Sequence, residues 1–252
     1  MRSLILKSLT LAGGLAVLAM PLSGLAGGVV VNGSTAEVQK RAAASSGFIQ
    51  VASPAKAFAY QPPMRGTASS GRVGGGTRGT ADAASVTVEV LAPDHAGLTV
   101  SEQPTLYWFV SQRIEVDAEL TIVDETSIDP LLELKLKPPI EAGIHALSLK
   151  EHGVQLKTDV PYQWFVAVVM DPSQRSYDLI AGGEITRVAQ PSNLAGTPQA
   201  YAEAGIWYDL LDGLSTEIGN RPKDTELRQQ RAALLEQVGL AGAAEYERAS
   251  NR

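Results

Sequence analysis

The stretch Leu156-Lys-Thr-Asp-Val-Pro161-Tyr162-Gln-Trp164 decides the expected fold of this 252-residue chain. It places a tyrosine six residues after a leucine, at the start of a long apolar strand. This spacing is typical of the tyrosine corner, in which the tyrosine hydroxyl bonds to upstream backbone as the chain crosses between two sheets. The stretch predicts an immunoglobulin or fibronectin type III-like antiparallel β-sandwich. Any other β-sandwich with an aromatic core is the alternative.

The surrounding segment, 85–190, has the patterns of short strands. Apolar and polar residues alternate over 132–136, whereas 106–110 is a continuous apolar run typical of a buried strand. Pro and Gly turn signals separate about seven such strands, with no helical pattern between them. We expect Trp108 to pack against Trp164 in the core of this domain.

The segment 191–252 changes to the spacing of helices. Apolar side chains recur every three or four positions between Trp207 and Ile218, and a second such face lies between Leu227 and Val238. Two or three helices of this size cannot bury their apolar faces alone. We expect them to dock on the sandwich or on a partner, and we predict that Trp207 packs on the sandwich.

The first 26 residues have the pattern of a signal peptide. Arg2 and Lys7 precede an apolar run over 9–22, and Gly24-Leu-Ala26 supplies small residues at the positions that a signal peptidase requires. The run is shorter than the roughly 20 residues that cross a bilayer. We therefore expect cleavage near Ala26, a periplasmic or secreted protein, and no membrane span in the mature chain.

Residues 27–84 have the composition of a disordered linker. Gly, Ala, Ser, Thr and Pro fill 35 of these 58 positions. So little large apolar area cannot offset the entropy of ordering the chain, about 1–2 kcal/mol per residue. A formal G-x-G-x-x-G at Gly74, Gly76 and Gly79 lacks the preceding strand and following helix of a dinucleotide site. We therefore expect a mobile, protease-sensitive segment and no cofactor.

Charge and cysteine content exclude several classes of partner and site. Residues 85–252 carry 13 Lys or Arg against 25 Asp or Glu, a balance of −12. Such an acidic domain repels phosphates, so we expect no nucleic-acid partner. The sequence has no cysteine, which excludes disulfides, zinc–thiolate centres and cysteine nucleophiles.

The remaining polar residues do not have the spacing of a catalytic or metal centre. His145 and His152 are seven positions apart, too far along a strand for neighbouring metal ligands. Asp124 and Glu125 are adjacent at a strand end and point to opposite faces, so they do not share a substrate. We predict no catalytic residue and no metal site.

The loop that joins the last two predicted strands is the candidate recognition site. Antibody-like folds place binding loops at this position. Arg175 and Tyr177 are residue types that anchor interfaces, and Asp171 begins the loop. The alternative is an ordinary hairpin loop in which Arg175 pairs with a neighbouring carboxylate.

Several motifs together resemble a known family. They are residues 74–79, GLTVSEQPTLYWF at 97–109, Pro161-Tyr-Gln-Trp164, Asp171-Pro172 with Arg175-Ser176, and YAEAGIWYD at 201–209. In this combination the chain resembles the bacterial family called domain of unknown function 928, over residues 72–245. The resemblance implies export and a shared architecture, and it supplies no catalytic residue.

We therefore expect an exported, non-catalytic envelope protein that binds an envelope protein or a glycan. The alternative is a carbohydrate-binding module, or a hydrolase with a site at the sandwich–helix junction. A row of exposed coplanar aromatic rings would favour sugar binding. A deep cleft with paired carboxylates would favour an enzyme.

Overall fold

The structure, a computed structural model, describes residues 58–63, 72–76, 86–124 and 127–250. All of them belong to one unit of the chain, Ala52–Arg252. The expected signal peptide over 1–26 lies outside the described residues, as does most of the expected linker over 27–84.

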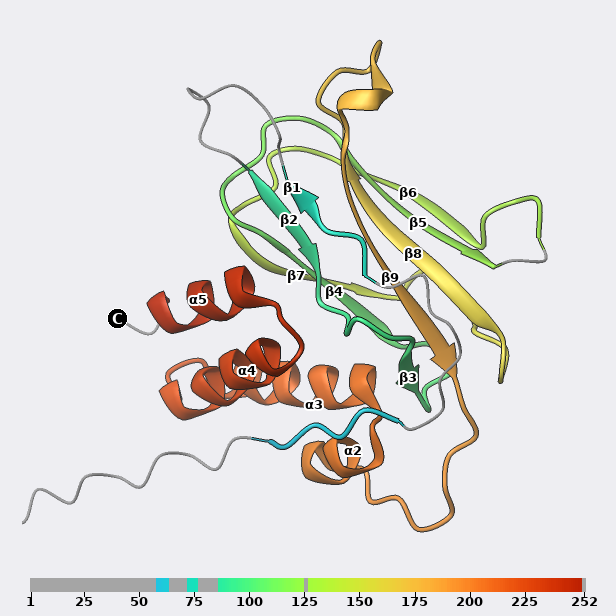
Figure 1. The fold of residues 1–252 in the computed structure, drawn as a ribbon, viewed down its shortest axis with the longest axis vertical. Helices are drawn as coiled ribbons and strands as arrows, with labels where there is room; N and C mark the ends of the chain where they lie inside the picture. Colours follow the sequence, from blue (N-terminus) through green and yellow to red (C-terminus); the bar gives the residue numbers. More distant parts are fainter. Residues whose placement is uncertain (1–57, 64–71, 77–85, 125–126, 251–252) are drawn as a thin grey trace, which may run out of the picture. The chain divides into compact units, whose positions relative to one another are not determined.

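The described strands form two sheets, one of four strands and one of five (Figure 1). The first has the order β1-β2-β4-β7 and the second β3-β9-β8-β5-β6. All pairs are antiparallel except β3 and β9, so the expectation of a purely antiparallel fold is corrected to a mixed one. The chain passes from the first sheet to the second between β2 and β3, and β3 then runs beside β9 in the same direction. The strands are β1 (Gly75–Gly76), β2 (Thr87–Val90), β3 (Gly97–Thr99), β4 (Thr105–Val110), β5 (Ala118–Asp124), β6 (Leu132–Leu136), β7 (Gly143–Ser148), β8 (Pro161–Val168) and β9 (Leu179–Arg187).

Strand β8 carries the stretch that decided the expected fold. Every second side chain of β8 is buried, as in a strand with one face against a core. The backbone N–H of Lys157 donates to the hydroxyl oxygen of the buried Tyr162 at 3.1 Å, so the predicted tyrosine contact is present. Trp108 and Trp164 are both buried in one core cluster, and the ring of Trp108 stacks on that of His145.

The helical segment holds four α-helices among its described residues, where two or three were expected. The additional helix is α2, which has no long apolar face and begins at a local signal. Thr197 caps it by accepting from the backbone N–H of Ala200, and Pro198 occupies its first turn. None of the described helices is long and apolar enough to cross a membrane. The helices are α2 (Pro198–Ala204), α3 (Trp207–Asn220), α4 (Thr225–Gln237) and α5 (Ala241–Ala249).

Helices α3 and α5 cover the outer face of the four-stranded sheet (Figure 1). The hydroxyl of Tyr107 on β4 donates to Asp212 of α3 at 2.7 Å. Two positions further along β4, the ring of Phe109 lies 5.4 Å from that of Tyr246 on α5. Strand β4 is therefore buried on both faces, which explains its continuous apolar run.

A buried ion pair joins α4 to α5. The guanidinium of Arg231 donates to both carboxylate oxygens of Glu247, at 3.0 and 2.8 Å, and to the hydroxyl of Ser215 at 3.0 Å. Arg231 and Glu247 are 7% and 2% exposed. Each charge is thus compensated where water is excluded.

Two segments inside the expected linker pack on the domain. Val73 exchanges two backbone hydrogen bonds with Gly182 of β9, at 2.9 and 2.8 Å. The guanidinium of Arg72 donates to the carbonyl oxygens of Ala92 and Val238, both at 2.9 Å. Residues 58–63 lie on the helices, with Tyr60 buried. The expectation of a linker through residue 84 is therefore wrong for 58–63 and 72–76, because backbone hydrogen bonds and single anchoring side chains order them without an apolar pattern.

Candidate functional site

The two sheets differ in what covers their outer faces. The described helices contact β2, β3, β4 and β7, and they lie away from β5 and β6 (Figure 1). The outward side chains of β5 and β8 are accordingly only partly buried. We call this outer face of the five-stranded sheet the open face.

Strand register places apolar side chains next to one another on the open face. Val73 pairs with Gly182, and Gly182 pairs with Phe165 of β8. Because directly opposed residues of antiparallel strands point to the same side, Val73 and Phe165 flank the glycine on one face. A Cβ atom at Gly182 would lie 2.5 Å from the Phe165 ring, so the ring lies over the glycine backbone. Ile180 and its partner Ala167 form the next row of the same face.

Exposed apolar side chains are concentrated around this sheet. Val73, Ile180 and Tyr177 are 46%, 44% and 61% exposed. Among the described residues, all the exposed large hydrophobic side chains belong to the five-stranded sheet, to the connections between its strands, or to Val73, which pairs with Gly182 of this sheet. The full set is Val73, Ile128, Leu131, Met170, Tyr177 and Ile180. Val73 and Ile180 lie beside the Gly182–Phe165 row of the open face, and exposed apolar side chains that adjoin on one face are typical of interaction surfaces.

The predicted recognition loop joins β8 to β9 at the end of the open face. Asp171 accepts from the backbone N–H and the hydroxyl of Ser173, at 2.8 and 2.7 Å, and these hydrogen bonds lower the pKa of Asp171. They shape the start of the loop as an Asx turn. Tyr177 ends a single 3-10 turn, Arg175–Tyr177, and is an exposed residue.

Arg175 holds the loop to the sheet. Its guanidinium donates to Glu119 of β5 at 2.6 Å and to Asp178 at 2.6 Å. The hydrogen bond from Arg175 lowers the pKa of Glu119, and the same bond raises the pKa of Arg175. Arg175 therefore pairs with neighbouring carboxylates, as expected for the alternative of an ordinary hairpin loop. These contacts also position Tyr177. Recognition by Asp171, Arg175 and Tyr177 stays a prediction.

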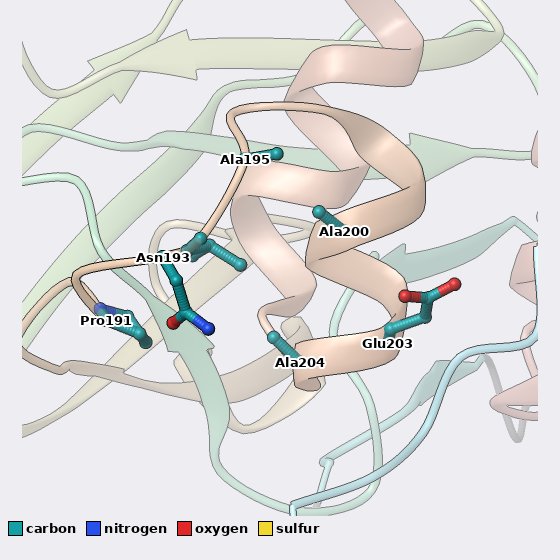
Figure 2. A pocket seen from close by; sticks show the side chains of 7 residues that line it. Pro191, Asn193, Ala195, Ala200, Glu203 and Ala204 are labelled. Atoms are coloured by element: carbon teal, nitrogen blue, oxygen red, sulfur yellow. The ribbon is translucent and has the colours of Figure 1, made fainter.

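A shallow pocket lies between the connection after β9 and helix α2. Its volume is about 330 Å³. Figure 2 shows Asn193 from the connection and Glu203 from α2 on its walls. Glu203 is its single carboxylate and accepts from Gln199 at 2.6 Å, so the pocket has no carboxylate pair for acid–base work. The lining residues are Pro191, Asn193, Leu194, Ala195, Ala200, Glu203 and Ala204.

Two carboxylates of α3 lie at the sandwich–helix junction. Asp209 accepts from the backbone N–H of Val100 at 3.1 Å, and burial raises its pKa. Asp212 accepts from the Tyr107 hydroxyl at 2.7 Å. Both therefore hold the helix to the sheets. Within the part of the chain that the structure describes, no group of three or more His, Asp or Glu is placed to hold a metal ion.

Sequence reasoning missed the open face itself. Phe165 and Ile180 lie at the strand positions that alternate with the buried ones. An apolar residue at such a position was the signal of an apolar outer face that the sequence offered. Val73 carried no signal, because its segment has the composition of a linker.

Comparison with known proteins identifies the family of the chain. A search of the curated proteins found no match. The model of the family described as Domain of Unknown Function (DUF928) matches residues 73–247, which include both sheets, helices α2 to α4 and most of α5. The chain therefore belongs to the DUF928 family.

Proposed function

We propose that this chain is an exported, non-catalytic binding protein that recognises a protein partner through the open face and the loop that ends in Tyr177. The observation that carries the proposal is the difference between the two sheets. Helices bury the outer face of one, while the other exposes Val73, Ile180 and Tyr177. Exposed apolar and tyrosine side chains beside charged groups are typical of protein interfaces.

The proposal includes an immunoglobulin-like arrangement of the strands. The order β2-β4-β7 corresponds to strands A, B and E, and β9-β8-β5-β6 corresponds to G, F, C and C′. The contact between Lys157 and Tyr162 lies at the start of the strand that corresponds to F, where the tyrosine corner occurs. In this arrangement residues 171–178 are the F–G loop, which supports their role in recognition.

Export is the part of the proposal that rests on residues 1–26. N-terminal sequencing of the protein from the envelope or the medium should find Gly27 as the first residue. Retention of Met1 in exported protein would contradict cleavage near Ala26.

Site-specific photo-crosslinking tests the binding surface. A benzophenone amino acid is placed at Tyr177, at Ile180, or at Gln229, an exposed position on α4 that serves as the matched control. We expect one and the same protein adduct from positions 177 and 180 in native cells, and its absence from position 229. Adducts that are identical at all three positions would contradict the proposal.

A binding variant separates a protein partner from a glycan. Ile180→Lys places a charge in the apolar row and should abolish the adduct formed from position 177, because burying an unpaired charge is unfavourable. A chain that yields no protein adduct and binds an oligosaccharide through Tyr177 would favour the carbohydrate-binding alternative instead.

A further inference from the structure

Residues 58–63, with the sequence Phe-Ala-Tyr-Gln-Pro-Pro, lie along the helices in an extended form. Figure 1 shows this segment beside α2 and α3, far along the chain from both. We call these residues the latch. The residues that hold the latch, which we call the latch site, are His95, Ala202, Gly205, Trp207 and Gln237.

The side-chain amide of Gln237 binds the latch backbone. Its Oε1 accepts from the backbone N–H of Tyr60 at 3.1 Å, and its Nε2 donates to the carbonyl oxygen of Phe58 at 2.6 Å. The amide thus contacts alternate residues of the latch, as a neighbouring β-strand would. The backbone N–H of Gln61 donates to the carbonyl oxygen of Ala202 at 3.1 Å. These bonds require an extended peptide and do not depend on its side chains.

Tyr60 is the side chain that anchors the latch. Its ring lies edge-on to the ring of Trp207, with 5.1 Å between centroids, and only 8% of the residue is exposed. Its hydroxyl oxygen lies 2.9 Å from Nε2 of His95. An aromatic ring in a desolvated pocket with a polar partner for its hydroxyl is the usual anchor of a recognised peptide.

Gly205 makes room for the residues after the tyrosine. It ends α2 with a φ of +71°, a conformation that favours glycine. A Cβ atom there would lie 2.6 Å from the carbonyl oxygen of Gln61 and 3.2 Å from Cδ of Pro63. The latch therefore fits against bare backbone at this point.

We propose that the latch site is a peptide-binding site for an extended segment of the form Phe-x-Tyr-x-x-Pro, and that residues 58–63 are an internal ligand which a partner peptide displaces. The five residues of the latch site lie within the family match over 73–247, whereas the latch lies outside it. This site is separate from the open face, so the inference does not depend on the proposed function.

The affinity of a free peptide is set by competition with the latch. A tethered ligand acts at an effective concentration on the order of millimolar, so the wild-type chain should bind a free peptide weakly. Removing the anchor of the latch should expose the site. The full-length Tyr60→Ala chain is then expected to bind the labelled peptide Ala-Phe-Ala-Tyr-Gln-Pro-Pro-Met at least about tenfold more tightly than the wild type does.

Fluorescence anisotropy with matched variants tests the assignment. Adding Gln237→Ala to Tyr60→Ala should abolish peptide binding, whereas Gln229→Ala, at an exposed position on the same helix, should not. A peptide with alanine in place of its tyrosine should not bind either. No saturable binding to Tyr60→Ala, or equal binding by the Gln237→Ala variant, would overturn the proposal.

A second measurement does not require removal of Tyr60. The chain has no cysteine, so Ala59→Cys, at an exposed position of the latch, accepts a single spin label. An excess of the peptide should raise the mobility of this label, and the alanine-substituted peptide should not. A label whose mobility stays unchanged at millimolar peptide would contradict displacement.

Discussion

The indole N–H of Trp164 donates a hydrogen bond to the hydroxyl oxygen of Tyr208 at 2.9 Å, which joins the core of the five-stranded sheet to helix α3. The same hydroxyl donates to the carbonyl oxygen of Glu184 at 3.0 Å. Burial raises the pKa of Tyr208, so the hydroxyl keeps its proton. A Cβ atom at Gly97 would lie 2.6 Å from the Tyr208 ring, so glycine is needed for this close approach. This buried polar contact therefore joins the helices to the sandwich.

We expect Tyr208→Phe to destabilise the whole unit by about 1–3 kcal/mol, because the indole N–H of Trp164 and the carbonyl oxygen of Glu184 lose a buried partner. Urea unfolding followed by circular dichroism measures this change. Tyr177→Phe, at an exposed ring, is the control and should stay within about 0.5 kcal/mol of the wild type. Equal effects of the two variants would refute a structural role for the Tyr208 hydroxyl.

Trp207→Ala should lower the stability of strands and helices together, by about 3–5 kcal/mol. The side chain is fully buried, and its indole N–H donates to the carbonyl oxygen of Leu91 at 2.8 Å. Circular dichroism of the helices and the fluorescence of Trp108 and Trp164 should give one coincident transition. Helices that melt separately, with the fluorescence transition unmoved, would show that they form an independent arm.

Replacing Arg231 alone should be more harmful than replacing the whole ion pair. Arg231→Met leaves the carboxylate of Glu247 buried without its main partner, at a cost of about 3–5 kcal/mol. The double variant Arg231→Met, Glu247→Leu should recover most of that loss, because apolar side chains of similar volume need no compensation. Free energies of unfolding from urea titration complete the double-mutant cycle. Additive effects of the two changes would be inconsistent with a buried pair.

Stability should fall as the pH is lowered through the titration of His95. Burial lowers the pKa of His95 from 6.5, although Asp94 partly opposes the shift. The unfolded chain then binds a proton more readily than the folded one, so the stability present above pH 6.5 is lost as the pH falls through the lowered pKa. Asp209 has the opposite effect on the pH dependence of stability. Because its pKa is raised in the folded chain, it contributes stability at low pH that is lost as the pH rises.

The difference between wild type and His95→Gln isolates the histidine, because the Asp209 contribution is common to both. We expect the variant to lose less stability than the wild type between about pH 7 and about pH 5. Urea titrations across this range measure it, with His152→Gln, at an exposed turn position, as the control. Parallel profiles for wild type and His95→Gln would exclude this role.

The sequence by itself determined the features that depend on near neighbours in the chain. The Tyr162 contact joins residues five positions apart, and the spacing from Leu156 to Tyr162 predicted it. The alternation in β6 and the apolar face of α3 follow from the periods of a strand and a helix, which any chain with that pattern adopts. The order of strands and then helices was predictable for the same reason.

Only the tertiary structure decided which surfaces are covered and which segments join the domain. Val73 pairs with Gly182, Arg72 binds the carbonyl oxygen of Val238, and Tyr60 packs on Trp207, across long separations in the sequence. These contacts use backbone groups and single side chains, which leave no period in the composition. Whether the helices cover the four-stranded or the five-stranded sheet depends on how Asp212 and Tyr246 meet β4, since both sheets carry apolar residues on their outer faces.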